Sequence, residues 1–198
     1  MNPQTYLFSK LIRITATAGL VVATLAGTGC ERPSSAAVQG RVEPSYDQST
    51  GKLTRLAYDA NNDGKHDTWA FMDGAKLTRL EADENQDGRI DRWEFYPDNA
   101  TKGAKQTPER IERSTRFDGQ VSRREFFENG VMARVEEDTD GNGTIDKWET
   151  YSAGALVVLA LDTQGHGKPD RRFLYNAEGG LEKIESDPSG SGHFEVVK

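Results

Sequence analysis

Six copies of one short unit follow one another along the chain, and this repetition limits the possible folds more than any other feature. Each copy contains a glycine within a short loop that is rich in aspartate and asparagine: Gly64, Gly88, Gly119, Gly143, Gly167 and Gly192. Successive glycines are 24, 31, 24, 24 and 25 residues apart, and the long interval contains an insertion near PDNATKGAKQT. Each unit must therefore form the same small structure and pack against its neighbours.

The short distance between these loops favours strands over helices. A 24-residue unit without its nine-residue loop is divided again by a second turn, such as MDG or ENG. Each half then has about six or seven residues, which is under two helical turns but a typical strand length. The halves that follow the loops carry Trp, Phe, Tyr and Ile, which favour strands. We therefore predict an all-β fold, an antiparallel meander of six β-hairpin repeats that is elongated or curled, over residues 46–198.

Both faces of this predicted sheet mix polar and apolar side chains. Around the second loop, Asp91, Trp93 and Phe95 alternate with Arg92 and Glu94, and alternate residues of a strand point to opposite faces. Hydrophobic residues make up only 35% of the chain, and glycine accounts for 20 of its 198 residues. We expect a thin core that needs another source of rigidity.

The acidic loops, which we number one to six, are predicted to bind calcium. In chain order they read DANNDGKHD, DENQDGRID, STRFDGQVS, DTDGNGTID, DTQGHGKPD and DPSGSGHFE. Acids and amides recur at positions one, three, five and nine, and the glycine at position six permits a sharp turn. Calcium takes six to eight oxygen ligands from such groups, whereas softer metals prefer cysteine and histidine.

Loops one, two and four have acids or amides at all four positions, and we predict metal sites there. With positions seven and twelve of loops two and four included, the predicted site residues are Asp59, Asn61, Asp63, Asp67, Asp83, Asn85, Asp87, Arg89, Asp91, Glu94, Asp138, Asp140, Asn142, Thr144, Asp146 and Glu149. Loop three has Arg116 at a ligand position and is predicted not to bind. Loops five and six are weaker, with Gln164 and Ser189 at position three.

Two known types of calcium loop resemble these sequences. Loops two and four match the EF-hand, in which a glutamate at position twelve, here Glu94 or Glu149, completes the ligand shell. The pattern D-x-D-x-D-G-x-x-D also resembles the strand-flanked loops of integrin-type β-propellers, in which position nine does so. Loop one has Asp67 at position nine but Ala70 at position twelve, and fits only the second type. The hairpin rhythm over 46–198 loosely resembles YD-type and MORN-type bacterial repeat proteins, although the acidic loop belongs to neither.

Residues 1–29 have the pattern of a signal peptide. Lys10 and Arg13 provide a positive region, and a short run of apolar and small residues follows over 14–26. A run of this length suits the hydrophobic region of a signal peptide and is too short for a folded protein's membrane-spanning helix.

Cys30, the single cysteine of the chain, follows directly after this segment. The stretch LAGTGC resembles the lipobox of bacterial lipoproteins, although Gly27 stands where that family usually has leucine. The resemblance implies cleavage before Cys30, acylation of its thiol, and lipid anchoring to a membrane of the bacterial cell envelope, on its periplasmic or surface face. Residues 30–45 would then be the lipidated cysteine and a flexible tether.

The charge of the chain narrows the range of partners. Without Lys10 and Arg13, 23 basic residues face 32 acidic ones, a net charge of −9. Such a charge argues against nucleic acid as a partner and favours cations. The three histidines, His66, His166 and His193, are a repeat apart and form no catalytic pattern. We expect no enzyme activity.

The function predicted on these grounds is a lipid-anchored, calcium-binding repeat protein of the cell envelope with a structural or binding-scaffold role. Trp69, Trp93 and Trp148 recur at one place in the repeat, which predicts either packing between hairpins or a strip that stacks on a glycan or protein. Two alternatives remain open. One is a helical EF-hand calcium buffer or sensor, and the other is an immunity or antitoxin-like lipoprotein, which rests only on the MORN-like rhythm.

Overall fold

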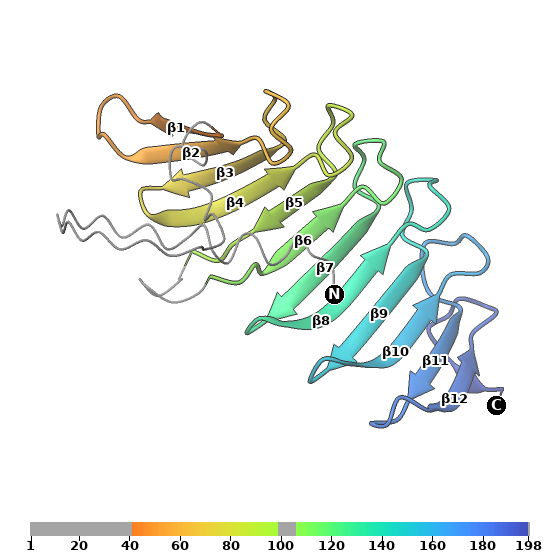
Figure 1. Ribbon diagram of the computed structural model, residues 1–198. Coiled ribbons are helices and arrows are strands. Elements are labelled where there is room, and N and C mark those ends of the chain that lie inside the picture. Colours follow the sequence, from red (N-terminus) through yellow and green to blue (C-terminus); the bar gives the residue numbers. More distant parts are fainter. Residues whose placement is uncertain (1–40, 99–105, 198) are drawn as a thin grey trace, which may run out of the picture. The chain divides into compact units, whose positions relative to one another are not determined.

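The computed structural model describes residues 41–98 and 106–197, which form one antiparallel sheet of 13 strands (Figure 1). The strands are β1 (Val42–Tyr46), β2 (Leu53–Tyr58), β3 (Thr68–Asp73), β4 (Lys76–Ala82), β5 (Arg92–Phe95), β6 (Arg110–Arg113), β7 (Arg123–Glu128), β8 (Val131–Glu137), β9 (Lys147–Ser152), β10 (Ala155–Leu161), β11 (Arg171–Tyr175), β12 (Leu181–Ser186) and β13 (Glu195–Val196). Strand order in the sheet follows the chain, so every connection joins neighbours, and β1 and β13 form the two edges of an open sheet.

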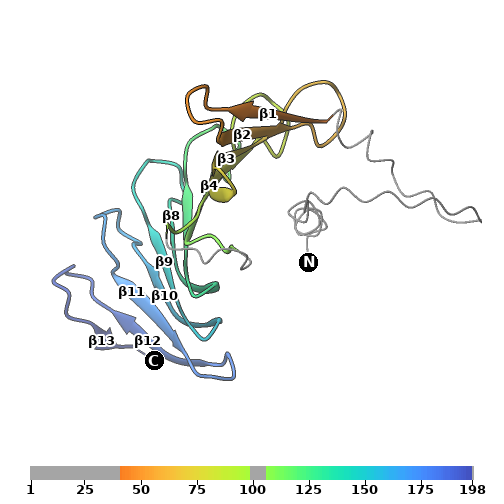
Figure 2. The same ribbon diagram turned by 90° about the vertical axis from the view of Figure 1, so that its left-hand side faces the viewer.

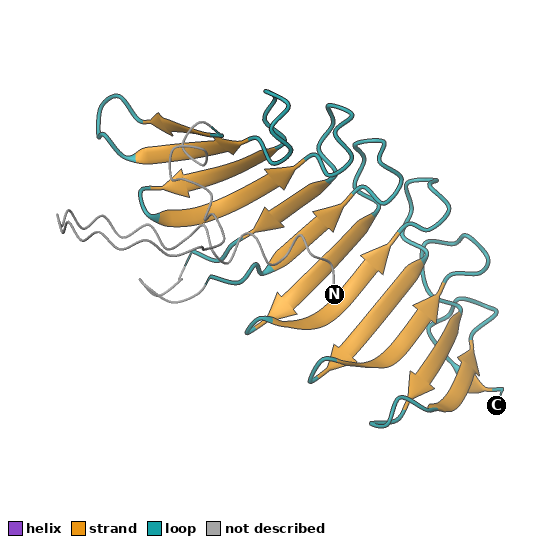
Figure 3. Cartoon of the chain, in the orientation of Figure 1, coloured by secondary structure: helices purple, strands orange, loops and turns teal. Residues whose placement is uncertain are grey.

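The predicted all-β meander is confirmed. The described part of the chain contains no helix (Figure 3), so the alternative of a helical EF-hand domain is wrong. Within the same residues there is accordingly no helix able to cross a membrane.

The start of the sheet differs from the prediction. Six hairpins account for twelve strands, and β1 adds a thirteenth before the first repeat. Because β1 covers Val42–Tyr46, the predicted tether over 30–45 ends earlier than expected. The signal segment over 1–29 and Cys30 lie outside the described residues.

The two ends of the strands carry different connections. Loops one to six join β2 to β3, β4 to β5, and so on to β12 and β13 (Figure 1). The connections at the opposite ends of the strands are shorter, except the one from β5 to β6, which contains the insertion. In the turn from β7 to β8, Asn129 and Gly130 have φ of 51° and 78°, and in the next such turn Ala153 and Gly154 have φ of 50° and 83°. Two successive positive φ values suit the two-residue turns whose twist matches that of paired strands.

The sheet has little apolar core. Successive strands rotate relative to one another, and the sheet twists along its length (Figure 2), as sheets of L-residues do. The buried hydrophobic residues of the described chain are Ala57, Leu77, Leu80, Ala82, Val135 and Ala160. Most other strand side chains are half-buried. Rigidity must therefore come partly from polar contacts.

One face of the sheet, which we call the glutamate face, alternates aliphatic and acidic side chains across the strands. Its central row of directly paired residues is Leu80, Glu94, Ile111, Glu125, Val135, Glu149 and Leu159. Arg92, Arg113, Arg123 and Lys147 lie within ion-pair distance of these glutamates. The glutamates are thus neutralised within the sheet itself.

The opposite face, which we call the tryptophan face, carries a row of aromatic and charged residues. This row is Trp69, Glu81, Trp93, Glu112, Arg124, Glu136 and Trp148. Beside it, Arg79, Arg110 and Arg134 stack on phenylalanine rings of neighbouring strands, with the guanidinium carbon 4.2, 4.1 and 3.8 Å from the ring centres. Cation–π contacts of this kind support strand pairing without a second layer.

Candidate metal sites

All six acidic loops lie on one side of the sheet, where the even-numbered strands end. Each loop follows an even-numbered strand, and these strands run in the same direction because the meander reverses at every connection. The loops therefore project side by side from the same ends of the strands (Figure 1). Residues that are a full repeat apart in sequence become neighbours here.

The first and ninth loop positions, apart from Glu195 of loop six, form a continuous row across the sheet, which we call the aspartate row. The strand registers, continued by one residue, place these positions opposite one another. The N–H of Asp83 donates to the carbonyl oxygen of Asp67 at 2.8 Å, and that of Asp162 donates to Asp146 at 2.8 Å. The row comprises Asp59, Asp67, Asp83, Asp91, Ser114, Ser122, Asp138, Asp146, Asp162, Asp170 and Asp187.

This row places like charges on adjacent strands. All its members except Asp146 are buried. Directly opposite residues of an antiparallel pair have Cβ atoms about 5 Å apart, and like charges at that separation are destabilising. The nine aspartates of the row therefore require hydrogen-bond donors or cations close by.

Main-chain N–H groups of the loops provide some of the hydrogen-bond donors that these aspartates require. In loop two, the N–H groups of Gln86 and Gly88 donate to Asp83 at 2.6 and 2.8 Å, and the N–H of Glu84 donates to Asp91 Oδ2 at 3.0 Å. Gly88 has a φ of 92°, which favours glycine. Equivalent bonds recur in loops one, four and five, so the first and ninth residues hold the shape of these loops.

Loop three shows how much of this shape depends on charge. Its first and ninth residues are Ser114 and Ser122, whose hydroxyl oxygens accept the same hydrogen bonds. The N–H of Gly119 donates to Ser114 Oγ at 3.1 Å, and the N–H of Thr115 donates to Ser122 Oγ at 2.9 Å. A neutral oxygen is therefore sufficient to form the loop, and the carboxylates of the other loops have capacity beyond this role.

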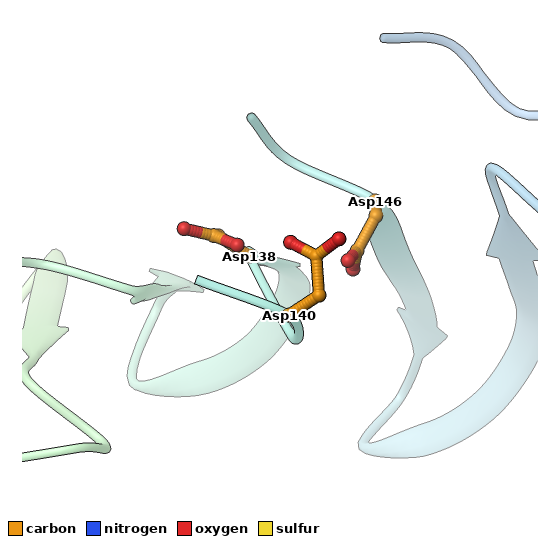
Figure 4. A group of neighbouring side chains, drawn as sticks. All are labelled: Asp138, Asp140 and Asp146. Carbon is orange, nitrogen blue, oxygen red and sulfur yellow. The ribbon is translucent and has the colours of Figure 1, made fainter. Parts of the chain in front are cut away.

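Loop four brings three of its predicted ligands together. Asp138, Asp140 and Asp146 each offer an oxygen, and these oxygens lie within 4.8 Å of one another (Figure 4). Ligands at about 2.3–2.6 Å from one ion are at most about 5 Å apart, so the cluster fits a calcium ion. Burial opposes ionisation of Asp138, but the N–H groups of Gly141 and Gly143, together with the charge of Arg116 and a hydrogen bond with Asp140, lower the pKa of this carboxyl group.

Loop two contains a buried carboxylate with one oxygen that has no hydrogen-bond partner within the described residues. Asp91 is 1% exposed, and its Oδ1 has no hydrogen-bond partner among the described residues. Its Oδ2 accepts from the N–H groups of Glu84 and Asn85. Burial, together with the nearby carboxylates of Asp83 and Asp87, raises the pKa of Asp91. A buried acceptor that faces like charges is the environment that a bound cation would relieve.

Loops one and two share a hollow of about 300 Å³. Asp63 and Asp67 of loop one line it, together with Asp83 and Asp87 of loop two. Within loop one, the N–H of Lys65 donates to Asp63 at 2.8 Å, and this bond lowers the pKa of the carboxyl group. Five predicted ligands of the two loops, including Asn61, thus face one solvent-accessible space, whereas Asp59, Asn85 and Asp91 do not line it.

The remaining predicted residues have other roles in the structure. Glu94 and Glu149 lie on the glutamate face, where Tyr96 donates to Glu94 and Tyr151 donates to Glu149 at 2.7 Å. The structure does not bring them together with the acids of the loops. At position seven, the N–H groups of Arg89 and Thr144 donate to the side chain at position five, at 2.9 and 2.7 Å.

The chain matches no protein-family model, and no curated protein matches it. Sequence reasoning located the loops but not the aspartate row, because position nine of one loop meets position one of the next only through the strand register. The signal that could have found it is the interval of 16 or 17 residues between the two positions, such as Asp67 to Asp83, which only the insertion before loop three lengthens.

Proposed function

We propose that this protein is a lipid-anchored, calcium-binding repeat protein of the bacterial cell envelope that acts as a structural or binding scaffold. The observation that carries the proposal is Asp91 Oδ1, which is buried and unpaired within the described residues. Calcium prefers carboxylate, amide and carbonyl oxygens, which is what loops one, two and four offer. The residues that would hold it are Asp59, Asn61, Asp63, Asp67, Asp83, Asn85, Asp87, Asp91, Asp138, Asp140, Asn142 and Asp146.

A scaffold role follows from the position of these loops. When bound, calcium would supply positive charge between carboxylates that otherwise repel one another. Each loop closes one hairpin and borders the next, so an ion in it stabilises two repeats of a sheet that has little apolar core. The loop acids hold main-chain N–H groups and leave further oxygens free for the ion.

Calorimetric titration of the full chain with calcium tests the assignment. We expect three sites, and we expect Asp91→Asn to weaken the loop-two site by at least about tenfold, because the buried charge that faces the ion is removed. Asp73→Asn is the matched control, since its side chain is 62% exposed at the opposite edge and pairs with Lys52. Wild-type protein that binds no calcium, or Asp91→Asn that binds like Asp73→Asn, would contradict the proposal.

Lipid anchoring is tested at Cys30, which lies outside the described residues. Mass spectrometry of the protein isolated from a bacterial membrane fraction should find an N-terminal acylated Cys30, without residues 1–29. Cys30→Ser should abolish the acylation and release the protein into the soluble fraction, because the anchor is then lost. An unmodified Cys30 in the wild-type protein would show that the lipobox interpretation is incorrect.

A further inference from the structure

Loop three carries a positive charge of its own and directs it at loop four. The Nη1 of Arg116 donates to the carbonyl oxygen of Asp138 at 3.0 Å, and its Nη2 lies 3.4 Å from Asp138 Oδ2. The Nε lies 3.7 Å from Asp118 Oδ2 within loop three. The guanidinium therefore joins the two loops, and it contacts the first residue of the acidic cluster in loop four.

Loop four is shaped to receive this side chain. Gly141 has a φ of 84°, and a Cβ atom at this position would lie 3.0 Å from the guanidinium carbon of Arg116. Any larger residue would force the guanidinium away from the loop. The absence of a side chain at Gly141 thus lets Arg116 lie against the main chain beside Asp138.

The corresponding contacts from position three of loops one and five are neutral, although Lys168 at position seven of loop five also donates to Gly190 of loop six. The side chain at position three of loop one, Asn61, donates to Gln86 of loop two at 2.8 Å, and Gln164 of loop five donates to the carbonyl oxygen of Pro188 in loop six at 3.3 Å. Position three thus reaches the next loop in loops one, three and five. In loop three this position holds a full positive charge.

We propose that Arg116 is an internal cation that competes with calcium for Asp138 and sets the calcium affinity of loop four, an inference that rests on the proposed calcium binding there. Loop three has serines at its first and ninth positions and acts on its neighbour without a metal of its own. Because Arg116 partly neutralises Asp138 and repels an incoming cation, its removal should tighten binding at loop four. A charge interaction at the protein surface corresponds to about threefold to tenfold in affinity.

A glycine amide at position six reports on each loop separately. Its N–H donates to the first residue of the same loop, for example from Gly143 to Asp138 at 3.0 Å and from Gly88 to Asp83 at 2.8 Å. In the full chain labelled with ¹⁵N-glycine in detergent, a calcium titration followed by NMR gives an affinity for loop two from Gly88 and for loop four from Gly143.

Three variants test the role of Arg116. Arg116→Gln should lower the dissociation constant read at Gly143 about threefold to tenfold and leave the one read at Gly88 unchanged. Arg116→Lys retains the charge and should remain close to the wild type. Arg55→Gln removes the same charge from an exposed position on β2 and should change neither loop.

The outcomes separate this inference from the proposed function. If calcium shifts Gly143 in both proteins but Arg116→Gln binds within twofold of the wild type, or more weakly, the role of Arg116 is refuted while calcium binding stands. If calcium leaves Gly143 unchanged in the wild type and in Arg116→Gln, the calcium site in loop four is refuted, and the inference with it.

Discussion

Removal of calcium should lower the melting temperature of the protein by about 15 °C or more. Binding to the native state alone adds about 2.7 kcal/mol per site at a hundredfold excess over Kd, so three sites add about 8 kcal/mol. This is comparable to the whole stability of many domains, and each kcal/mol shifts the melting temperature of a chain of this size by about 2–4 °C. The effect should be large here because the described residues bury few apolar side chains and nine acidic members of the aspartate row face one another.

Calorimetry or circular dichroism in excess EDTA and in millimolar calcium measures this difference. A third sample in EDTA with potassium chloride at matched ionic strength is the control, because salt alone screens repulsion between carboxylates. We expect the potassium sample to recover only a small part of the shift. Equal melting temperatures in EDTA and calcium would rule out a structural role for the ion.

Arg123→Ala should lower the free energy of unfolding by about 3 kcal/mol, the usual result of removing one partner from a buried ion pair. Arg123 lies on the glutamate face and contacts Glu125 and Glu137 at 2.8 Å each and Glu149 at 3.8 Å. Its side chain is only 20% exposed. Without it, three poorly solvated carboxylates would lose a cation that they share. Lys147 would then be the nearest cation to Glu137 and Glu149.

Urea denaturation of Arg123→Ala and of the matched variant Arg134→Ala measures this effect. Arg134 lies on the tryptophan face, pairs with Glu136 at 3.1 Å, stacks on Phe126 and is 54% exposed. An exposed ion pair and an exposed cation–π contact each contribute about 1 kcal/mol or less, so we expect a smaller loss than for Arg123→Ala. Adding Glu137→Gln to Arg123→Ala should restore part of the lost stability, because one uncompensated charge is removed. Equal losses for the two arginine variants would show that the network on the glutamate face carries no special weight.

The strand meander could be predicted from the sequence because its signals are local. A 24-residue period that contains two turns leaves only strand-length segments, and residues such as Trp93 and Phe95 favour strands. The alternation at Asp91, Arg92 and Trp93 placed the faces as the structure has them. β1 was missed because Val42–Tyr46 lies before the first repeat and contains a proline, which is tolerated at the edge of a sheet.

The candidate site was predictable only in part. Loop positions one, three, five and nine were found from spacing, and loop four brings Asp138, Asp140 and Asp146 together. Glu94 and Glu149 matched the EF-hand spacing by number alone. In a strand, position twelve lies an odd number of residues beyond position nine, so its side chain points to the opposite face from Asp91 or Asp146. There it accepts a hydrogen bond from Tyr96 or Tyr151.

The sequence by itself determined the repeat, the strand lengths, the turns and the acidic loops, because each depends on residues within one unit of about 24 positions. Tertiary structure decided what those loops face. Pairing in register turned separate loops into one aspartate row, left Asp91 Oδ1 buried and unpaired within the described residues, and directed Arg116 to Asp138. The physical reason is that hydrogen-bonded strands bring residues of neighbouring repeats to within about 5 Å, a distance at which charges interact strongly and which no spacing along the chain reveals.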